Sequence, residues 1–398
     1  MKIAILTPIY PYRTVGNCFT PVVHYFAREW AAQGHEVEVF HITTRYPDAL
    51  YRFCRLTEKS LVSWLGFLVP TAPHEEFDER IEGILVHHLN CVKVIPHSRV
   101  RASRLAQLTE RIEAVIGDAV PDVFIAHWDN PQLDLLYRLK QHYHRPTFLT
   151  LHSGEQYFRR IYGSSLRPMM QSLDGLGFRS MAAKRHFESL FWPVEHAFYA
   201  FSGVSQSIVD MPQRERDGQS VSRLVFVGSL IKRKFPEEII PAAMRVWGQD
   251  NFAVTYVGEG KERGNIVAHY GTMLGDRLTF TGKIERSRIV EHLDRSDIFV
   301  MISRTEVFGL VYLEAMSRGC ITVASRGEGI DGIIVDGQNG FLCEAGNVEE
   351  LAAVFERIQQ MTPAQRKRIS DNAIQTARDF TDQKVAAKYL DAVEQLMR

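Results

Sequence analysis

The sequence predicts an α/β protein of two doubly wound, Rossmann-like domains, each with a parallel sheet covered by helices. Apolar runs of strand length alternate with helical stretches along the chain, stop at a polar stretch near its middle, and then restart. The 398 residues also exceed what a single hydrophobic core usually sustains. A composition of 45% hydrophobic and 24% charged residues is that of a globular protein.

The first domain is expected to start with a strand, a helix and a second strand. The N-terminal "KIAILTP" is an apolar run of strand length, and "HEVEVFHI" is the next such run. Between them residues 20–34 are helical in composition, with Pro21 suited to the first turn and Gly34 to the end. A strand, helix, strand unit predicts parallel pairing. The pattern recurs in "DVFIAHW", "NPQLDLLYRLKQHY" and "PTFLTLHS", and "HAFYAFSGVS" is expected to close this half.

The polar residues 210–222, which carry Pro and Gly and have no apolar period, are interpreted as the linker. Beyond them the expected strands are "RLVFVGS", "FAVTYVGEG", "RLTFTG", "DIFVMIS" and "CITVAS", with helices such as "PEEIIPAAMRVWG" between them. The expected domains are therefore residues 1–212 and 213–378. Residues 379–398 are expected to form a helix that packs back on the first domain. Such domains bind ligands at the carboxyl ends of their strands.

Composition excludes several classes of function. Lys plus Arg equals Asp plus Glu at 47 each, so the overall charge does not indicate nucleic acid as a partner. The five cysteines have no C-x-x-C spacing, which argues against a disulfide framework or a zinc site and favours a reducing cytoplasm. No run reaches the roughly 18 to 20 apolar residues of a spanning helix. The N-terminal run is interpreted as a strand and not as a signal peptide.

Two glutamates eight positions apart bracket the stretch "EVFGLVYLE", residues 306–314. Glu306 is expected in the loop after a strand and Glu314 within the following helix, roughly 12 Å away at helical rise. Between them the amides of Phe308, Gly309 and Leu310 start the helix, where unpaired N–H groups stabilise an anion. A carboxylate, an anion site and a second carboxylate could bind a sugar, a diphosphate and a ribose. Acidic residues are nevertheless common in first helical turns, so this spacing also occurs by chance.

The chain resembles the family 4 retaining glycosyltransferases, which have the GT-B architecture of two Rossmann-like domains facing each other across a cleft. The motifs that carry the resemblance are "EVFGLVYLEAMSRGCITVAS", "DGIIVDGQNGFL", "LVFVGSLIKRKF", "YVGEG", "LTFTG" and the start "ILTPIYPYRTVGN". The resemblance implies that Glu306 contacts donor-sugar hydroxyls and Glu314 the nucleotide ribose. It also implies that His152 lies beside the reacting sugar, with His127 as the competing candidate.

The resemblance implies two further donor contacts made by backbone. Gly16, in the first strand-to-helix loop, would let the backbone approach the diphosphate, because glycine has no Cβ. The backbone of Lys283 would meet the nucleobase.

The segment "VGSLIKRKF" resembles the family's diphosphate-binding segment, in which an arginine and a lysine bind the phosphates. Lys234 matches the lysine, but Ser229 stands at the arginine's position. A serine can donate one hydrogen bond and carries no charge, so Lys232 or Arg233 could supply the missing charge, or Lys234 could act alone. A basic surface turn is the alternative interpretation.

Two other motifs bear on cofactors. "GEGIDG", residues 327–332, fits a dinucleotide fingerprint, but the sequence that follows predicts turns and not the helix such a site needs. The chain has no D-x-D pair of the kind that holds a divalent ion in related enzymes. We therefore expect no metal and no cofactor.

The function expected from this resemblance is transfer of a hexose, with retention, from a nucleotide diphosphate sugar to a hydroxyl of a glycan or lipid-linked acceptor in surface polysaccharide biosynthesis. UDP is favoured over GDP as the donor nucleotide. A non-catalytic sugar-nucleotide-binding subunit and a related epimerase are the alternatives. The apolar residues 60–70 and the basic stretches 98–104 and 158–170 suggest peripheral contact with the inner face of a membrane, although a core helix and a solvated basic face would explain them equally.

Overall fold

The computed structural model describes residues 1–11, 21–45, 76–93, 98–152, 155–212 and 217–398. The chain forms two compact units. Unit 1 comprises Met1–Phe178, Leu190–Ala200 and Ala386–Arg398, and unit 2 comprises Arg179–Ser189 and Phe201–Val385.

The sheet of unit 1 has the strand order β3-β4-β2-β1-β5-β6-β7-β8 among the described residues. All neighbours pair in parallel except β3 and β4, which form an antiparallel hairpin at one edge. The sequence analysis did not predict this hairpin. The strands are β1 (Lys2–Thr7), β2 (Glu36–Arg45), β3 (Phe77–Ile81), β4 (Ile84–Val92), β5 (Val123–His127), β6 (Thr147–Leu151), β7 (Gly175–Phe178) and β8 (Ala197–Tyr199).

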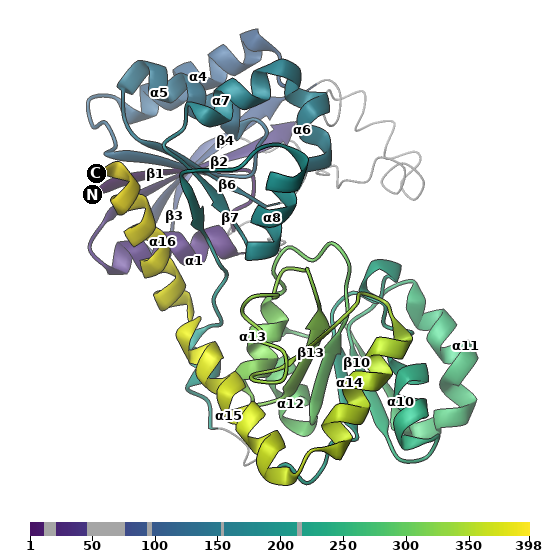
Figure 1. The fold of residues 1–398 in the computed structure, drawn as a ribbon. Coiled ribbons are helices and arrows are strands. Elements are labelled where there is room, and N and C mark those ends of the chain that lie inside the picture. The colour runs from purple at the N-terminus through teal and green to yellow at the C-terminus, as the bar shows by residue number, and fades with distance from the viewer. Residues whose placement is uncertain (12–20, 46–75, 94–97, 153–154, 213–216) are drawn as a thin grey trace. The chain divides into compact units, whose positions relative to one another are not determined.

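Helices cover both faces of this sheet, with α4, α5 and α7 together on one face and α1 and α16 on the other (Figure 1). The helices around unit 1 are α1 (Val22–Ala32), α4 (Ala102–Ile116), α5 (Gln132–Tyr143), α6 (Glu155–Tyr162), the 3-10 turn η1 (Gly163–Ser165), α7 (Leu166–Gln171) and α16 (Asp382–Met397). α8 (Met181–Leu190) leads out of this unit.

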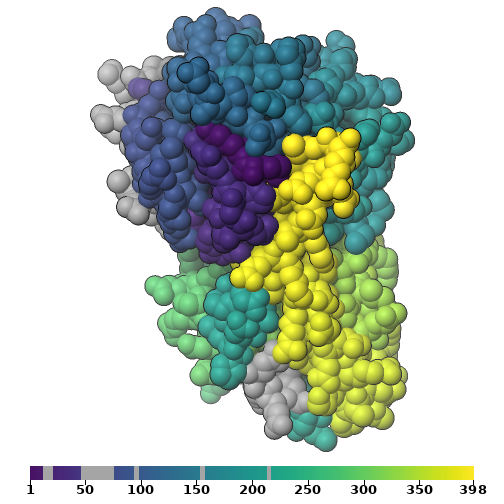
Figure 2. Space-filling model, turned by 90° about the vertical axis from the view of Figure 1, so that its left-hand side faces the viewer, coloured from purple at the N-terminus to yellow at the C-terminus, as the bar shows by residue number. Residues whose placement is uncertain are grey.

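The C-terminal helix packs on the start of the chain. The indole N–H of Trp30 donates a hydrogen bond to the carbonyl of Ala386 at 2.9 Å, and the hydroxyls of Tyr389 and Thr150 are 2.7 Å apart. Figure 2 shows the C-terminal residues lying against the N-terminal ones on this face. The last helix therefore belongs to the core of unit 1 from Ala386 onward.

The sheet of unit 2 has the order β11-β10-β9-β12-β13-β14, and every pair of neighbours is parallel. Its strands are β9 (Arg223–Val227), β10 (Ala253–Val257), β11 (Leu278–Gly282), β12 (Ile298–Met301), β13 (Ile321–Ser325) and β14 (Phe341–Cys343). Its helical elements are α9 (Gln206–Val209), η2 (Lys232–Lys234), α10 (Ile239–Trp247), α11 (Glu262–Leu274), η3 (Gly275–Arg277), α12 (Arg286–Arg295), α13 (Leu310–Ser317), α14 (Val348–Gln360) and α15 (Pro363–Asp379). Two α/β units with largely parallel sheets confirm the predicted fold class.

The expected domain boundaries differ from the observed ones. The chain enters unit 2 after Ala200, before the expected linker, and residues of α8 also group with unit 2. The physical reason is contact, because Arg185 of α8 pairs with Asp331 at 3.6 Å. At the other end, Asp382 remains with unit 2 because its N–H donates to the carbonyl of Val204 at 3.0 Å.

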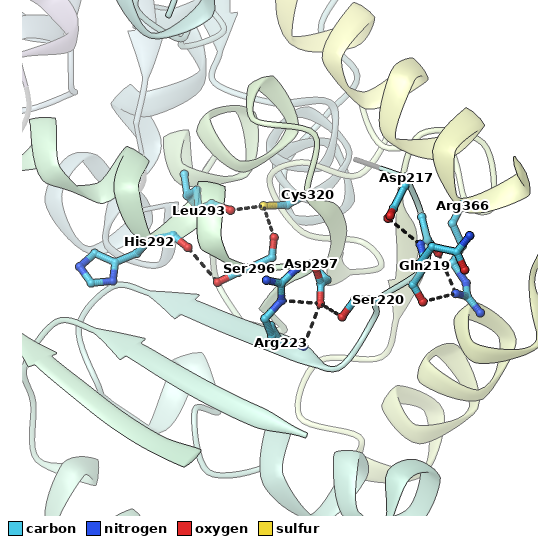
Figure 3. A network of polar contacts seen from close by, with 11 residues as sticks. Asp217, Gln219, Ser220, Arg223, His292, Leu293, Ser296, Asp297, Cys320 and Arg366 are labelled. Carbon is cyan, nitrogen blue, oxygen red and sulfur yellow. Dashed lines mark hydrogen bonds and ion pairs between the residues drawn. The ribbon is translucent and has the colours of Figure 1, made fainter. Parts of the chain in front are cut away.

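A polar network ties the segment before β9 to unit 2, at the amino end of its strands (Figure 3). The buried carboxylate of Asp297 accepts hydrogen bonds from Ser220 Oγ at 2.7 Å and from Arg223 Nε at 3.0 Å. Arg366 of α15 donates to the carbonyls of Gly218 and Gln219 at 2.8 and 3.3 Å. Residues 217–222, expected to be linker, are therefore part of the packed unit.

The Asp297 contacts predict a pH-dependent contribution to stability. Burial alone would raise the pKa of Asp297, but the hydrogen bonds from Arg223 and Ser220 hold it below its ordinary value. A lowered folded-state pKa stabilises the fold at neutral pH, and this contribution is lost as pH falls below about 4. We expect Asp297→Asn to cost roughly 1–2 kcal/mol at pH 7, with the gap narrowing below pH 4, measured by urea unfolding. The exposed control Asp276→Asn should change stability little at either pH, and a gap that does not vary with pH would contradict the assignment.

Candidate functional site

The residues expected to bind the donor in unit 2 lie where its strands end. Because the strands are parallel, their carboxyl ends share one edge of the sheet. The loop after β9 carries Ser229 and leads to Lys234, Lys283 follows β11, and the loop after β12 carries Glu306. These loops lie at the edge opposite the Asp297 network.

An ion pair joins two of these loops. Lys234 Nζ lies 3.4 Å from Glu306 Oε2, and both side chains are 14% exposed. Arg233 NH1 lies 3.6 Å from the same oxygen, and its side chain is 45% exposed. Neither Ser229 nor Lys232, both exposed, has a contact with Glu306 among the described residues. Arg233 is therefore a second cation beside Glu306, in addition to Lys234, and is the candidate for the charge that Ser229 lacks.

The backbone of Glu306 is held by the segment that resembles a dinucleotide fingerprint. The N–H of Glu306 donates to the Glu328 carboxylate at 2.8 Å, and its carbonyl accepts from the N–H of Gly329 at 2.9 Å. A Cβ on Gly329 would lie 2.5 Å from the backbone of Val307 and Phe308, so only glycine allows this approach. The segment forms turns and opens no helix, as predicted. Glu328 lies in the quoted motif "GEGIDG" but was not predicted as a site residue, because only tertiary packing brings it to Glu306.

The amides expected between the two glutamates lie at the start of α13. Gly309 has φ +79°, and a Cβ there would lie 2.4 Å from the Tyr312 ring. Tyr312 cannot yield easily, since it is buried and its hydroxyl donates to the carbonyl of Met301 at 2.6 Å. Burial, with the Glu306 charge nearby, raises the pKa of Tyr312 well above its ordinary value. Among the described residues, none accepts a hydrogen bond from the N–H groups of residues 308–310.

Glu314 lies one turn further along α13 and is 3% exposed. Its Oε1 accepts a hydrogen bond from Arg286 Nε at 2.7 Å, and Arg286 begins α12. A buried carboxylate is costly without such a partner. The sequence analysis did not identify Arg286, because nothing in the local sequence shows that the starts of α12 and α13 meet. Lys283, three positions earlier, is exposed.

His152 belongs to unit 1 and lies at the end of β6, whereas the site residues named above belong to unit 2. It is 9% exposed, and its Nε2 lies 2.9 Å from Nδ1 of His127 at the end of β5. The Trp128 ring stacks on it, with ring centroids 3.7 Å apart at 13°. The two histidines that competed in the sequence analysis are thus neighbours across parallel strands. Gly16 lies outside the described residues.

Comparison with known proteins assigns both halves of the chain. The family described as "Glycosyl transferases group 1" matches residues 212–376, and the "Glycosyl transferase 4-like domain" matches residues 19–202. The chain carries the two domains of a family 4-like GT-B glycosyltransferase. These matches confirm the predicted resemblance to family 4-like GT-B glycosyltransferases.

Two named relatives match parts of this chain. It is 30% identical over 147 residues to N-acetyl-alpha-D-glucosaminyl L-malate synthase of Bacillus anthracis, covering 36% of the chain and 38% of that protein. It is 31% identical over 170 residues to the lipopolysaccharide core biosynthesis glycosyltransferase LpsD of Rhizobium meliloti, covering 42% of the chain and 48% of LpsD. The chain thus aligns with less than half of the length of these relatives.

Solved structures support the same fold. The sucrose-phosphate synthase of Thermosynechococcus elongatus matches with a TM-score of 0.70 at 16% identity, covering 100% of this chain and 99% of the other. Anabaena HepE in complex with UDP matches with a TM-score of 0.68 at 16% identity, covering 99% and 100%. At this identity the likeness shows the GT-B fold alone.

Two searches of the described residues concern metals and membranes. No group of three or more His, Cys, Asp or Glu side chains in this part of the glycosyltransferase could hold a metal ion. None of its described helices combines the length and the apolarity needed to cross a bilayer.

The conformation of Gly309 predicts a sharp response to a methyl group. Gly309→Ala should destabilise the protein by roughly 2 kcal/mol or more, because φ is positive and Cβ meets the fixed Tyr312 ring. It should also displace the amides of residues 308–310 and weaken nucleotide-sugar binding, measured by thermal unfolding with and without ligand. The control Gly264→Ala, on α11 with open space around its Cβ, should be neutral or slightly stabilising. Equal behaviour of the two variants would contradict this account.

Proposed function

We propose that the protein is a retaining hexosyltransferase that uses a nucleotide diphosphate sugar, with UDP favoured over GDP, and transfers to a hydroxyl of a glycan or lipid-linked acceptor in surface polysaccharide biosynthesis. The observation that carries the proposal is the Lys234–Glu306 pair beside the unengaged amides that start α13. Glu314 then lies at the far end of the same short segment. A carboxylate beside a cation, then an anion site and then a second carboxylate fit a sugar, a diphosphate and a ribose in that order.

Each donor group has a partner of suitable chemistry in this proposal. Lys234 and Arg233, both close to Glu306, turn from that carboxylate to the diphosphate when the donor binds, and the amides of residues 308–310 add hydrogen bonds at the positive end of the helix. Glu306 then accepts from hydroxyls of the sugar. Glu314, held by Arg286, presents its other oxygen to the ribose, and the backbone of Lys283 meets the base.

The proposed chemistry needs few protein groups. The acceptor hydroxyl attacks the anomeric carbon on the face that the nucleotide leaves, the bond from that carbon to the diphosphate oxygen breaks, and the same oxygen takes the acceptor's proton. Protein groups mainly position the donor and stabilise charge on the leaving diphosphate. His152, oriented by His127 and Trp128, supports the reacting face of the sugar.

The proposal assigns no metal to this reaction. Lys234, Arg233 and the helix-start amides together supply the positive potential that a divalent ion would otherwise provide. The solved complex of the similarly folded HepE with UDP and the relative named for lipopolysaccharide core biosynthesis support UDP and a surface glycan as the first substrates to test.

The proposed location is the cytoplasm, with peripheral contact at the inner face of a membrane where the acceptor is lipid-linked. Of the segments that suggested this contact, residues 60–70 lie outside the described residues. Both basic stretches are described: residues 98–104 lead into α4, and residues 158–170 run from α6 through η1 into α7.

Replacing the two residues closest to the reacting sugar tests the proposal. Glu306→Gln keeps the shape of the side chain but removes the charge, and His152→Ala removes the imidazole. Each should lower turnover by about a hundredfold or more, measured as nucleotide released from the nucleotide sugar, while thermal unfolding shows a folded protein.

Exposed residues of the same types provide the controls. Glu291→Gln and His142→Ala should retain wild-type turnover. Wild-type-like turnover in both Glu306→Gln and His152→Ala would refute the catalytic assignment. A wild-type protein that binds a nucleotide sugar without releasing nucleotide to any acceptor would favour a binding subunit.

The replacement of the family's arginine by Ser229 leads to a separate test on adjacent cations. Arg233→Gln should weaken nucleotide-sugar binding by roughly 1 kcal/mol, about fivefold, because it removes a charge next to Glu306. Lys232→Gln should leave affinity unchanged. The measurement is ligand-induced thermal stabilisation by UDP-, GDP-, ADP- and dTDP-sugars, and the reverse order of the two effects would assign the charge to Lys232.

A further inference from the structure

Unit 1 has a surface pocket that the proposed donor site does not use. It lies between the start of α4, the first turns of α5, and η1 with α7, and has a volume of about 600 Å³. Its floor is apolar and buried, formed by Val100, Leu105 and Met169. Its rim includes Tyr137, one of the large apolar side chains exposed on this protein, and Pro168.

Arginines line one wall of this pocket. Arg99 is held by Asp134, with 3.0 Å from Nε to Oδ1, and it also donates to Ser165 Oγ at 3.0 Å. Arg138, half-buried on the same wall, has no hydrogen bond or ion pair with the described residues. Arg101 and Arg167 are exposed beside the lining residues, without a carboxylate partner in the described part of the chain. The pocket therefore joins an apolar floor to an excess of positive charge.

The side chain of Asp134 independently indicates that a ligand binds in the pocket. It lines the pocket and is 2% exposed, yet its Oδ2 accepts no hydrogen bond from the described residues. Buried carboxylate oxygens are seldom left in that state. Asp134 Oδ2 can therefore accept a hydrogen bond from a hydroxyl of a ligand at the pocket wall, next to Arg138.

The pocket lies at the edge of unit 1 that also carries His152. α5 begins just after β5, so its first turns lie at the carboxyl edge of the sheet. The loop that joins them contains Trp128, which stacks on His152, and Asp129, whose carbonyl accepts from the Tyr162 hydroxyl at 2.7 Å. The pocket and His152 therefore lie at the same edge of this sheet.

We propose that this pocket binds the phosphate end of a lipid-linked acceptor. The hydrocarbon next to the phosphate packs on Val100, Leu105 and Met169, and the phosphate pairs with Arg138 and the preoriented Arg99. A hydroxyl of the sugar on that phosphate donates to Asp134. The inference rests on the proposed transferase function for its biological meaning, but the binding itself is measurable without turnover.

The test compares three small probes on the full chain by titration calorimetry. Geranyl phosphate combines a short hydrocarbon with a phosphate, geraniol lacks the phosphate, and inorganic phosphate lacks the hydrocarbon. Geranyl phosphate should bind at least about tenfold more tightly than either of the others. Equal affinity for geraniol, or for inorganic phosphate, would overturn the proposal.

Variants locate the binding. Arg138→Gln and Tyr137→Ser, both at partly exposed positions, should each weaken geranyl phosphate about tenfold or more and leave the nucleotide-sugar-induced thermal shift unchanged. The control Arg368→Gln, exposed on α15 in unit 2, should affect neither ligand. Unchanged affinity in Arg138→Gln would overturn the pocket assignment.

A last arm separates a single lipid-linked acceptor from a bilayer. If Arg138→Gln reduces binding to phosphatidylglycerol vesicles but not to geranyl phosphate, the pocket assignment is overturned in favour of a general membrane contact. If geranyl phosphate binds as proposed while no nucleotide sugar binds, the pocket stands and the transferase proposal fails.

Discussion

The parallel pairing of β9 with β12 is the constraint on which the proposed donor site depends. Leu224 pairs with Ile298, so both strands run in the same direction and end at the same edge. Only because of this do the loop with Lys234 and the loop with Glu306 meet, although the two residues are far apart in sequence. Their ion pair at 3.4 Å is the direct consequence. An antiparallel β12 would carry its loop to the opposite edge of the sheet, where β9 begins at Arg223.

The two edges of this sheet differ in how far their polar groups are satisfied within the protein. At the amino edge, Asp297 and Arg366 have their hydrogen bonds satisfied within the protein, which anchors the segment before β9. At the carboxyl edge, the amides of residues 308–310 have no acceptor among the described residues. Lys234, whose Nζ also donates to Met301 Sδ at 3.6 Å, forms an ion pair with a carboxylate that could exchange it for phosphate. Satisfied polar groups stabilise the fold, whereas groups with capacity to spare can bind a ligand.

Sequence patterns predicted the parts that depend on local structure. The two-unit α/β fold follows from the alternation of strand and helix patterns along the chain. The placement of Glu306 in a loop and of Glu314 in a helix follows from the same patterns within one short segment. The partners Arg286 and Glu328 were not predictable, because each meets its glutamate only through tertiary packing. The grouping of α8 with unit 2 was not predictable for the same reason, since it involves the contact of α8 with Asp331 and not composition.

In the proposed site, Arg233 supplies the positive charge that the related family carries at the position of Ser229. A guanidinium on a long side chain can serve the same anion from a different backbone position, provided that the turn beneath it is fixed. Here the short helix η2 places Arg233 and Lys234 consecutively, and the carbonyl of Arg233 accepts from the N–H of Arg304 at 2.8 Å in the loop that carries Glu306. The same backbone bond therefore fixes both the cation and the loop it faces. A serine at position 229 is then compatible with two positive charges beside Glu306, because the second charge no longer depends on that position.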